Sequence, residues 1–278
     1  MKRLLAIVII IILLSLPALA DAPRYRALCA GMTVYEDGRA RLGGLNSIAG
    51  VADALTFALD GETRFSGEII FDMTREELFS AIRRRFAYAK EDDVSLIYLT
   101  AHGGKDADTV YIELAGDDRL TPQELETVTR EIPGRVILFI DCCFSGGFAE
   151  GEDASGWLLP SCFDSGKYLL LTSCSWDEES YRVTEGELNE DTVSTAFARS
   201  VCEGLGWDMI KDRPCELRAD FNLDGRVTLF ELYAYARTRV GFYLYADPAH
   251  MQTVSLYPNP AHFILARRAP AEEPLIGR

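Results

Sequence analysis

The sequence predicts an α/β protein, a three-layer α/β/α sandwich whose central sheet is mainly parallel. Short apolar runs alternate along the 278 residues with segments in which apolar residues recur at helical spacing. The run at 94–101 does not alternate between apolar and polar residues, as expected of a strand that is covered on both faces. Because strands and helices follow one another in this order, we expect parallel strands in one sheet with helices on both faces.

The first half of the chain alternates strands and helices. The predicted elements are, in order, a strand at 26–32, a helix at 46–59, a strand at 67–71, a helix at 75–89 and a strand at 94–101. Thr74 and Glu77 have the spacing of a capping box, in which each side chain accepts the backbone N–H of the other residue. This pattern predicts where the second helix begins.

The second half continues the alternation. The predicted elements are a small hairpin arm at 111–114, a helix that begins near 121, strands at 136–140 and 168–172, and a helix at 195–205. Thr121 is the expected N-cap, and Pro122 falls in the first turn, where its missing N–H costs nothing. Two further segments, 252–258 and 263–266, predict a final strand or edge segment that closes the same domain.

Residues 1–20 have the features of a secretory signal peptide. A basic start at Lys2 and Arg3 precedes a continuous apolar run, which ends in the small residues of Ala18-Leu19-Ala20. The alternative is an uncleaved membrane anchor, because the apolar run approaches the roughly 17 residues that span a bilayer. Pro17, just before the small residues, favours cleavage. We therefore predict a secreted or extracytoplasmic protein with no stable membrane insertion after cleavage.

The mature chain is expected to form one domain at 21–268, followed by a polar, proline-containing tail at 269–278 that we expect to be disordered. The formal net charge is −15, and the basic residues cluster only at 83–85, within a predicted helix. An acidic chain without an exposed basic patch is unsuited to polyanions. These observations exclude nucleic acid and anionic lipid as expected partners.

The cysteine count is odd. The seven cysteines stand at positions 29, 142, 143, 162, 174, 202 and 215. At least one must stay free or pair between chains in an oxidising compartment, which a reactive thiol would explain. The alternative is that several are buried small hydrophobic residues. No Cys-x-x-Cys pair occurs, and the three histidines lack ligand spacing, so a zinc site is not expected.

Two predicted strands end in residues that carry chemistry. The run VSLIYLTAHGG ends in His102, and the run RVILFIDCCFSGG ends in Cys143. The carboxyl ends of parallel strands are where ligands and catalytic groups collect in open α/β sheets. The two runs together therefore predict a Cys-His nucleophilic enzyme. Taken singly, each has a simpler interpretation, an ordinary turn for His102 and core packing for the adjacent cysteines.

The chemistry assigns a role to each group. Cysteine attacks as the thiolate, and backbone N–H groups at a strand-to-turn junction stabilise that negative charge. We predict that Cys143 is the nucleophile, that His102 is the acid–base group, and that the N–H groups of Gly103 and Cys143 bind the oxyanion.

These motifs resemble those of the caspase and metacaspase superfamily of cysteine peptidases. A strand ending in His-Gly-Gly is followed about forty residues later by a strand ending in Asp-x-Cys-x-Ser-Gly, and the resemblance spans roughly 25–205. It implies a caspase-like sheet, a protein or peptide substrate, and Cys143 rather than Cys142 as the nucleophile. Phe144 is a departure, because metacaspases usually carry histidine there; it leaves the subgroup and the substrate preference open.

The resemblance also implies a specificity. Asp141 stands where metacaspases have an aspartate that helps bind a basic substrate side chain, and Asp177 falls where they place a second pocket acid. We therefore predict cleavage after arginine or lysine. The alternatives are a solvated acidic loop at 176–179 and an aspartate-directed specificity, for which Arg182 is the only nearby basic candidate.

Residues 220–231, DFNLDGRVTLFE, match the EF-hand calcium loop. The expected oxygen ligands are the side chains of Asp220, Asn222, Asp224, Thr228 and Glu231 and the backbone carbonyl of Arg226. Gly225 falls at the sharp turn, whereas Pro214 interrupts the approach where an entering helix would lie. Since only one such loop occurs, we predict a structural calcium ion rather than a switch. The alternative is an ordinary Asn/Asp/Gly surface turn.

The leading hypothesis is therefore a secreted, calcium-binding, caspase-like cysteine endopeptidase. A second hypothesis is a catalytically silent caspase-like domain that acts as a calcium-braced binding module. A third is another acyl-transferring thiol enzyme, such as a transpeptidase.

Overall fold

A computed structural model describes residues 22–35, 44–106, 109–152, 158–159, 161–163, 166–184, 192–245, 250–258 and 262–268. The predicted signal peptide and the predicted disordered tail lie outside these residues. No helix within the described ranges is long and apolar enough to cross a bilayer.

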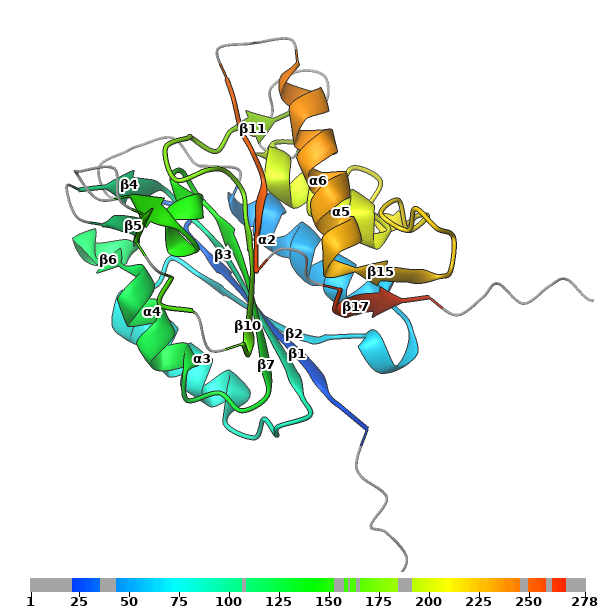
Figure 1. Ribbon diagram of the computed structural model, residues 1–278, viewed down its shortest axis with the longest axis horizontal. Coiled ribbons are helices and arrows are strands. Elements are labelled where there is room, and N and C mark those ends of the chain that lie inside the picture. The colour runs from blue at the N-terminus through cyan, green and yellow to red at the C-terminus, as the bar shows by residue number, and fades with distance from the viewer. Residues whose placement is uncertain are drawn as a thin grey trace, which may run out of the picture.

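A six-stranded sheet forms the centre of the molecule (Figure 1). Its strands, in spatial order, are β16 (Ser255–Tyr257), β10 (Tyr168–Thr172), β7 (Arg135–Asp141), β3 (Val94–Thr100), β1 (Tyr25–Gly31) and β2 (Ser66–Phe71). Four of the five pairings are parallel, and only the edge strand β16 runs antiparallel to its neighbour β10. The predicted mainly parallel sheet is confirmed.

Helices cover both faces of this sheet, which confirms the predicted three layers. Figure 1 shows α3 (Arg75–Phe86) and α4 (Pro122–Thr129) on one face. On the other face lie α2 (Gly44–Asp53), α5 (Ala196–Leu205) and α6 (Leu229–Leu244).

The strand β3 shows why its sequence does not alternate. Leu96 and Tyr98 belong to the core under α2, α5 and α6, whereas Ile97 and Leu99 belong to the core under α3 and α4. All seven residues of the strand are buried. Both faces of the sheet therefore need apolar side chains.

The predicted helix starts are confirmed by their caps. Thr74 and Glu77 form the capping box of α3, and Thr121 and Glu124 form that of α4, with Pro122 in its first turn. The helix ends are less well predicted. Helix α3 ends at Phe86, before the expected residue 89, and α2 passes into a π-helical turn at Ala54–Ala58.

Smaller elements lie at the two ends of the sheet. The predicted hairpin arm is a three-stranded sheet of β4 (Gly103–Lys105), β5 (Val110–Glu113) and β6 (Arg119–Leu120). Of the two expected C-terminal segments, the first supplies β16 of the main sheet. The second supplies β17 (Ile264–Arg267), which pairs instead with β15 (Arg226–Thr228).

Candidate active site

The register of β3 and β7 brings the predicted histidine and cysteine to one edge of the sheet. Thr100 pairs with Asp141 on the last rung of the two parallel strands. His102 lies two residues after Thr100, and Cys143 lies two residues after Asp141. The N–H of Ala101 still bonds the Asp141 carbonyl oxygen at 3.3 Å, so the two chains stay together beyond the strands.

Gly103 lies directly against the cysteine segment. A Cβ atom at this position would be 2.1 Å from the Cys143 carbonyl oxygen and 3.0 Å from the Cys142 Sγ. Only glycine permits this approach without moving the backbone. The backbone of the histidine segment is therefore held at the nucleophile, where the sequence places the two N–H groups of the oxyanion site.

His102 is held in place by an aromatic ring. Its backbone N–H donates to the Tyr35 hydroxyl at 2.7 Å, and the Tyr35 and His102 rings lie 4.7 Å apart between centroids. On its other side, the Glu113 N–H donates to the His102 carbonyl oxygen at 2.9 Å. The His102 backbone is thus held between the segment that follows β1 and the hairpin arm.

The two adjacent cysteines have different surroundings. Cys142 is buried, and burial raises the pKa of its thiol well above the ordinary value. Cys143 is half-buried, and the Ser180 N–H donates to its Sγ at 3.4 Å. The distinction that the sequence motif makes between the two thiols matches their accessibility.

The surroundings of Cys143 disfavour its thiolate form. Burial raises the pKa of Cys143, and the hydrogen bond from the Ser180 N–H only partly opposes this effect. We expected backbone N–H groups at the strand end to stabilise the thiolate. The backbone N–H of Cys143 itself and that of Ser180, which belongs to another segment, both lower this pKa, but desolvation outweighs them because partial burial penalises the charged form.

The segment Ser175–Tyr181, here called the cover loop, lies over Cys143. The Phe144 N–H donates to the Glu178 carbonyl oxygen at 2.8 Å, and the Ser180 carbonyl oxygen lies 4.0 Å from the Cys143 Sγ. A peptide group of the chain itself therefore occupies the neighbourhood of the thiol.

Two side chains attach the cover loop to the segment that precedes β16. Glu178 accepts the Thr253 N–H at 2.6 Å and the Thr253 hydroxyl at 2.9 Å. Gln252 accepts the Tyr181 N–H at 2.9 Å and donates to the Ser180 hydroxyl at 3.3 Å. The cover loop is thus held by residues more than seventy positions later in the chain.

Asp141 is buried beneath this loop, and its side chain is 1 % exposed. It accepts hydrogen bonds from the hydroxyls of Tyr98 at 2.8 Å, Thr195 at 2.5 Å and Ser180 at 3.2 Å. Burial raises the pKa of Asp141 to about 6, although the three hydroxyls oppose this. Asp177, the second predicted pocket acid, is exposed on the cover loop. The structure therefore places the two acids at different depths.

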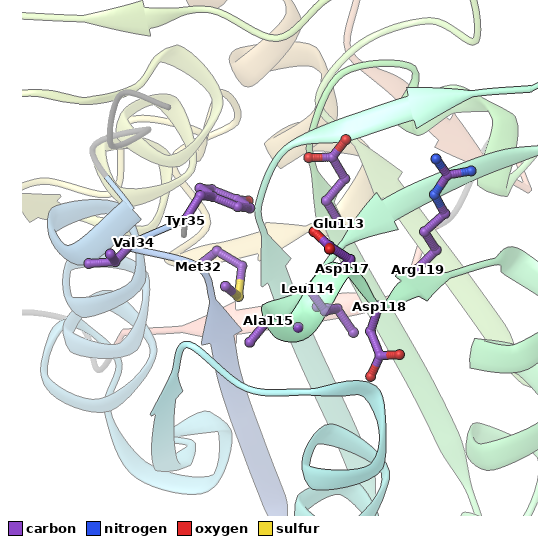
Figure 2. A pocket seen from close by; sticks show the side chains of 10 residues that line it. Met32, Val34, Tyr35, Glu113, Leu114, Ala115, Asp117, Asp118 and Arg119 are labelled. Atoms are coloured by element: carbon purple, nitrogen blue, oxygen red, sulfur yellow. The ribbon is translucent and has the colours of Figure 1, made fainter. Parts of the chain in front are cut away.

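A cavity of about 260 Å³ lies behind Tyr35 (Figure 2). Met32, Val34 and Tyr35 line one side, and the turn from Glu113 to Arg119 lines the other. Tyr35 therefore both lines this cavity and contacts the His102 ring.

The predicted calcium loop has the expected turn. Gly225 has a φ of 74°, and its N–H donates to Asp220 Oδ2 at 2.9 Å. The Asp224 N–H donates to Asn222 Oδ1 at 2.9 Å, and the Arg226 N–H donates to Asp224 Oδ1 at 2.8 Å. These side-chain oxygens accept N–H groups of the same loop. Oxygen atoms at alternate loop positions are the type of ligand that calcium binds.

The side chain of Glu231 is engaged in a helix cap. Its carboxylate accepts the N–H and the hydroxyl of Thr228, both at 2.8 Å, and so forms the capping box of α6. Over the described ranges, no three acidic, histidine or cysteine side chains converge to hold a metal ion. The donor types and their order fit calcium, but Glu231 would have to rotate to join them. The segment before the loop is not a helix, as Pro214 indicates. It contains the hairpin of β13 (Trp207–Asp208) and β14 (Arg213–Pro214).

The sequence matches no protein-family profile and no curated protein. Solved structures do resemble the fold. Caspase-1 from Spodoptera frugiperda superimposes with a TM-score of 0.56 at 15% identity, covering 84% of this chain and 86% of that one. The chain has a caspase-like fold. The structure described as pro-sf-caspase-1 gives a TM-score of 0.55 at 13% identity, with 84% and 90% covered. A protein from Geobacter sulfurreducens gives 0.53 at 17% identity, with 89% and 98% covered.

Sequence reasoning missed three residues of this candidate site. Tyr35 lies 67 positions before His102, and Ser180 and Gln252 come from a loop and from the segment before an edge strand. No local motif contains any of them. Tyr35 follows the predicted first strand, so its place at the same sheet edge was the one available signal.

Proposed function

We propose that this protein is a secreted, caspase-like cysteine endopeptidase in which Cys143 is the nucleophile and His102 the acid–base group. The observation that carries the proposal is the shared rung, since both residues stand two positions beyond the Thr100–Asp141 pair. The caspase-like fold supports a cysteine-peptidase scaffold. Secretion rests on residues 1–20, which lie outside the described residues.

The chemistry follows from these positions. His102 takes the Cys143 proton, and the thiolate sulfur bonds to the substrate carbonyl carbon. The N–H groups of Gly103 and Cys143 stabilise the oxyanion. The C–N bond then breaks, and the proton on His102 passes to the leaving amine. Water, deprotonated by His102, hydrolyses the thioester and restores the thiol.

The cover loop must move before substrate binds. Because the pKa of Cys143 is raised and the Ser180 peptide group lies at its sulfur, the described conformation favours the resting thiol. A substrate peptide replaces the Ser180 group and brings its carbonyl to the same sulfur.

We infer cleavage after arginine or lysine, with Asp141 and Asp177 as the acids that bind the basic side chain. The acidity of the cover loop, with Asp177 and Glu179 exposed, supports this specificity. Movement of the loop also frees Asp141 from Ser180, one of its three hydroxyl donors. A peptide library cut preferentially after aspartate would show that the specificity is wrong.

We also propose a structural calcium ion at residues 220–231. Asp220, Asn222, Asp224, Thr228 and Glu231 and the Arg226 carbonyl would hold it. When bound, the ion supplies positive charge that ties the start of α6 to the β15–β17 pair.

The test of the main proposal uses the mature protein and a thiol-directed peptidyl inhibitor. Wild type should be labelled and should cleave Arg-containing peptides. Cys143→Ala should lose both properties, whereas Cys142→Ala, the matched neighbour, should keep them. Cleavage that persists in Cys143→Ala would overturn the proposal.

The covered thiol gives one specific reason to consider a second function, a catalytically silent, calcium-braced binding module. This alternative predicts no turnover and no selective labelling at Cys143, so the same experiment separates the two.

A further inference from the structure

A lysine and two aromatic rings meet at the edge of the active site. Lys105 Nζ lies 4.8 Å from the ring centroid of Phe144 and 5.1 Å from that of Trp176. The three residues, here called the cationic clamp, come from three segments: strand β4, the turn after Cys143 and the cover loop. The clamp contains Phe144, the residue at which the sequence departs from the metacaspase pattern.

The two rings are positioned by their backbones. Phe144 has a φ of 62°, in the left-handed region that a residue with a bulky side chain rarely adopts, and its N–H is bonded to Glu178. The backbone N of Trp176 lies so close to Gly146 that a Cβ there would be 2.6 Å from it. The rings are thus held in place, and the lysine charge is held over them.

The Lys105 charge is available to a ligand. Its side chain is exposed, and no carboxylate within the described part of the chain forms an ion pair with it. The neighbouring Asp106 is paired with Arg119 at 3.0 Å. The chain has a net charge of −15, so the positive charge of Lys105 near Cys143 is opposite in sign to that of the molecule as a whole.

We propose that Lys105 is a specificity-determining residue that binds a substrate carboxylate on the leaving-group side of the cleaved bond. The proposal rests on the proposed peptidase function. Lys105 follows His102 by three residues along β4, and His102 is the group that protonates the leaving amine. The substrate class is therefore a peptide with a basic residue before the cleaved bond and an acidic residue soon after it.

Charge variants of Lys105 test this directly. Three peptides differ only in carrying Glu, Gln or Lys in the first two positions after the cleaved Arg. Wild type should prefer Glu over Gln by about two- to fivefold in kcat/KM, the range of an exposed ion pair. Lys105→Met, which keeps the length of the side chain, should lose the preference, and Lys105→Glu should favour the Lys peptide. Lys90→Met removes the same charge before β3, at the opposite end of the strand, and should change nothing.

A second measurement needs no turnover. The alkylation rates of Cys143 by iodoacetate and by iodoacetamide are compared by mass spectrometry, because the two reagents differ by one negative charge. The ratio of iodoacetate to iodoacetamide rates should fall about two- to fivefold in Lys105→Met relative to wild type and Lys90→Met.

The outcomes separate the two proposals. If wild type and Lys105→Met cleave the peptides with the same ratio of Glu to Gln rates, the proposed role of Lys105 is wrong and the proposed peptidase function stands. If no peptide is cleaved but the alkylation ratio depends on Lys105, the peptidase function is wrong and the anion-binding role stands. If neither measurement depends on Lys105, the inference is overturned.

Discussion

The positions of single residues explain how a loop and a strand end can form a reactive site. Gly103 lets the histidine segment lie directly against the cysteine segment, because any side chain there would collide with the Cys143 carbonyl oxygen. Phe144 is the point of strain, and Asp141 is a buried acid held by three hydroxyls. Each feature makes a prediction at the scale of one side chain.

Gly103→Ala should reduce peptide cleavage by at least about 100-fold, since misplacement by about 1 Å is sufficient for such a loss. The Cβ would lie 2.1 Å from the Cys143 carbonyl oxygen, so the backbone must shift. Gly241→Ala is the matched control, because position 241 in α6 has open space around it. Steady-state kinetics of both variants measures the effect; equal activity would show that the contact between the two segments is unimportant.

The pH dependence of stability should report on Asp141. Its pKa is raised from 3.8 to about 6, so between these values the folded protein binds more protons than the unfolded chain. Stability from this group is therefore present at low pH and is lost as the pH rises through 6. Two pKa units correspond to about 3 kcal/mol.

Urea unfolding of wild type and Asp141→Asn at pH 5 and pH 8 measures this contribution. Wild type should lose more stability between the two pH values than the variant does, by about 1.4 kcal/mol, because pH 5 lies one unit below the folded-state pKa of about 6. The same pH dependence in both proteins would contradict the assignment of the buried charge to Asp141.

At the scale of elements, the cover loop contacts Cys143 through the Ser180 peptide groups. Its attachment depends on side chains that precede β16, at the edge of the sheet next to β10. The hairpin arm of β4, β5 and β6 holds the histidine from the other side, through the bond from Glu113 to His102. Cys143 and His102 are therefore held by two different elements, which meet where Lys105 of β4 lies over the Trp176 ring.

Loosening the cover loop should expose Cys143. Gln252→Ala removes the bonds to Tyr181 and to the Ser180 hydroxyl, and we expect iodoacetamide to alkylate Cys143 about three- to tenfold faster, the effect of losing one or two net hydrogen bonds. Gln123→Ala, an exposed position on α4, is the control. A rate unchanged by Gln252→Ala would mean that the loop does not restrict the thiol.

Predictability from sequence also differs from element to element. The helix caps at Thr74 and Thr121 and the meeting of the strand ends that carry His102 and Cys143 were predictable. Each depends on neighbours within a few residues or on the shared direction of parallel strands. Tyr35 and Gln252 were not, since each reaches the site through a side-chain contact between segments far apart in the chain. The burial of Asp141 likewise depends on Tyr98 and Thr195, which belong to other elements.

At the scale of the whole molecule, the sheet divides the core into two clusters, and the calcium-type loop lies beside only one of them. Val227 and Leu229, two residues of the loop, pack into the cluster shared by α2, α5 and α6. An ion in the loop would therefore stabilise the folded molecule by binding it and not the unfolded chain.

Calcium should raise the Tm of the protein. At a concentration about 100 times its Kd, the ion would add about 2.7 kcal/mol to the free energy of unfolding. Glu231→Gln keeps the capping partner of Thr228 but weakens the ligand set, so it should reduce the shift without lowering the Tm measured in chelator. Thermal scans with calcium and with chelator test this; identical shifts in both proteins would exclude the loop as the site.

The central claim is that His102 activates Cys143 at the shared end of β3 and β7. The most direct measurement is the rate and site of labelling by an arginine-ended, thiol-directed peptidyl inhibitor, read by mass spectrometry in wild type and His102→Ala. The account predicts one adduct, on Cys143, formed at least about 100-fold more slowly in the variant. Labelling on Cys142, or equal rates in the two proteins, would contradict it.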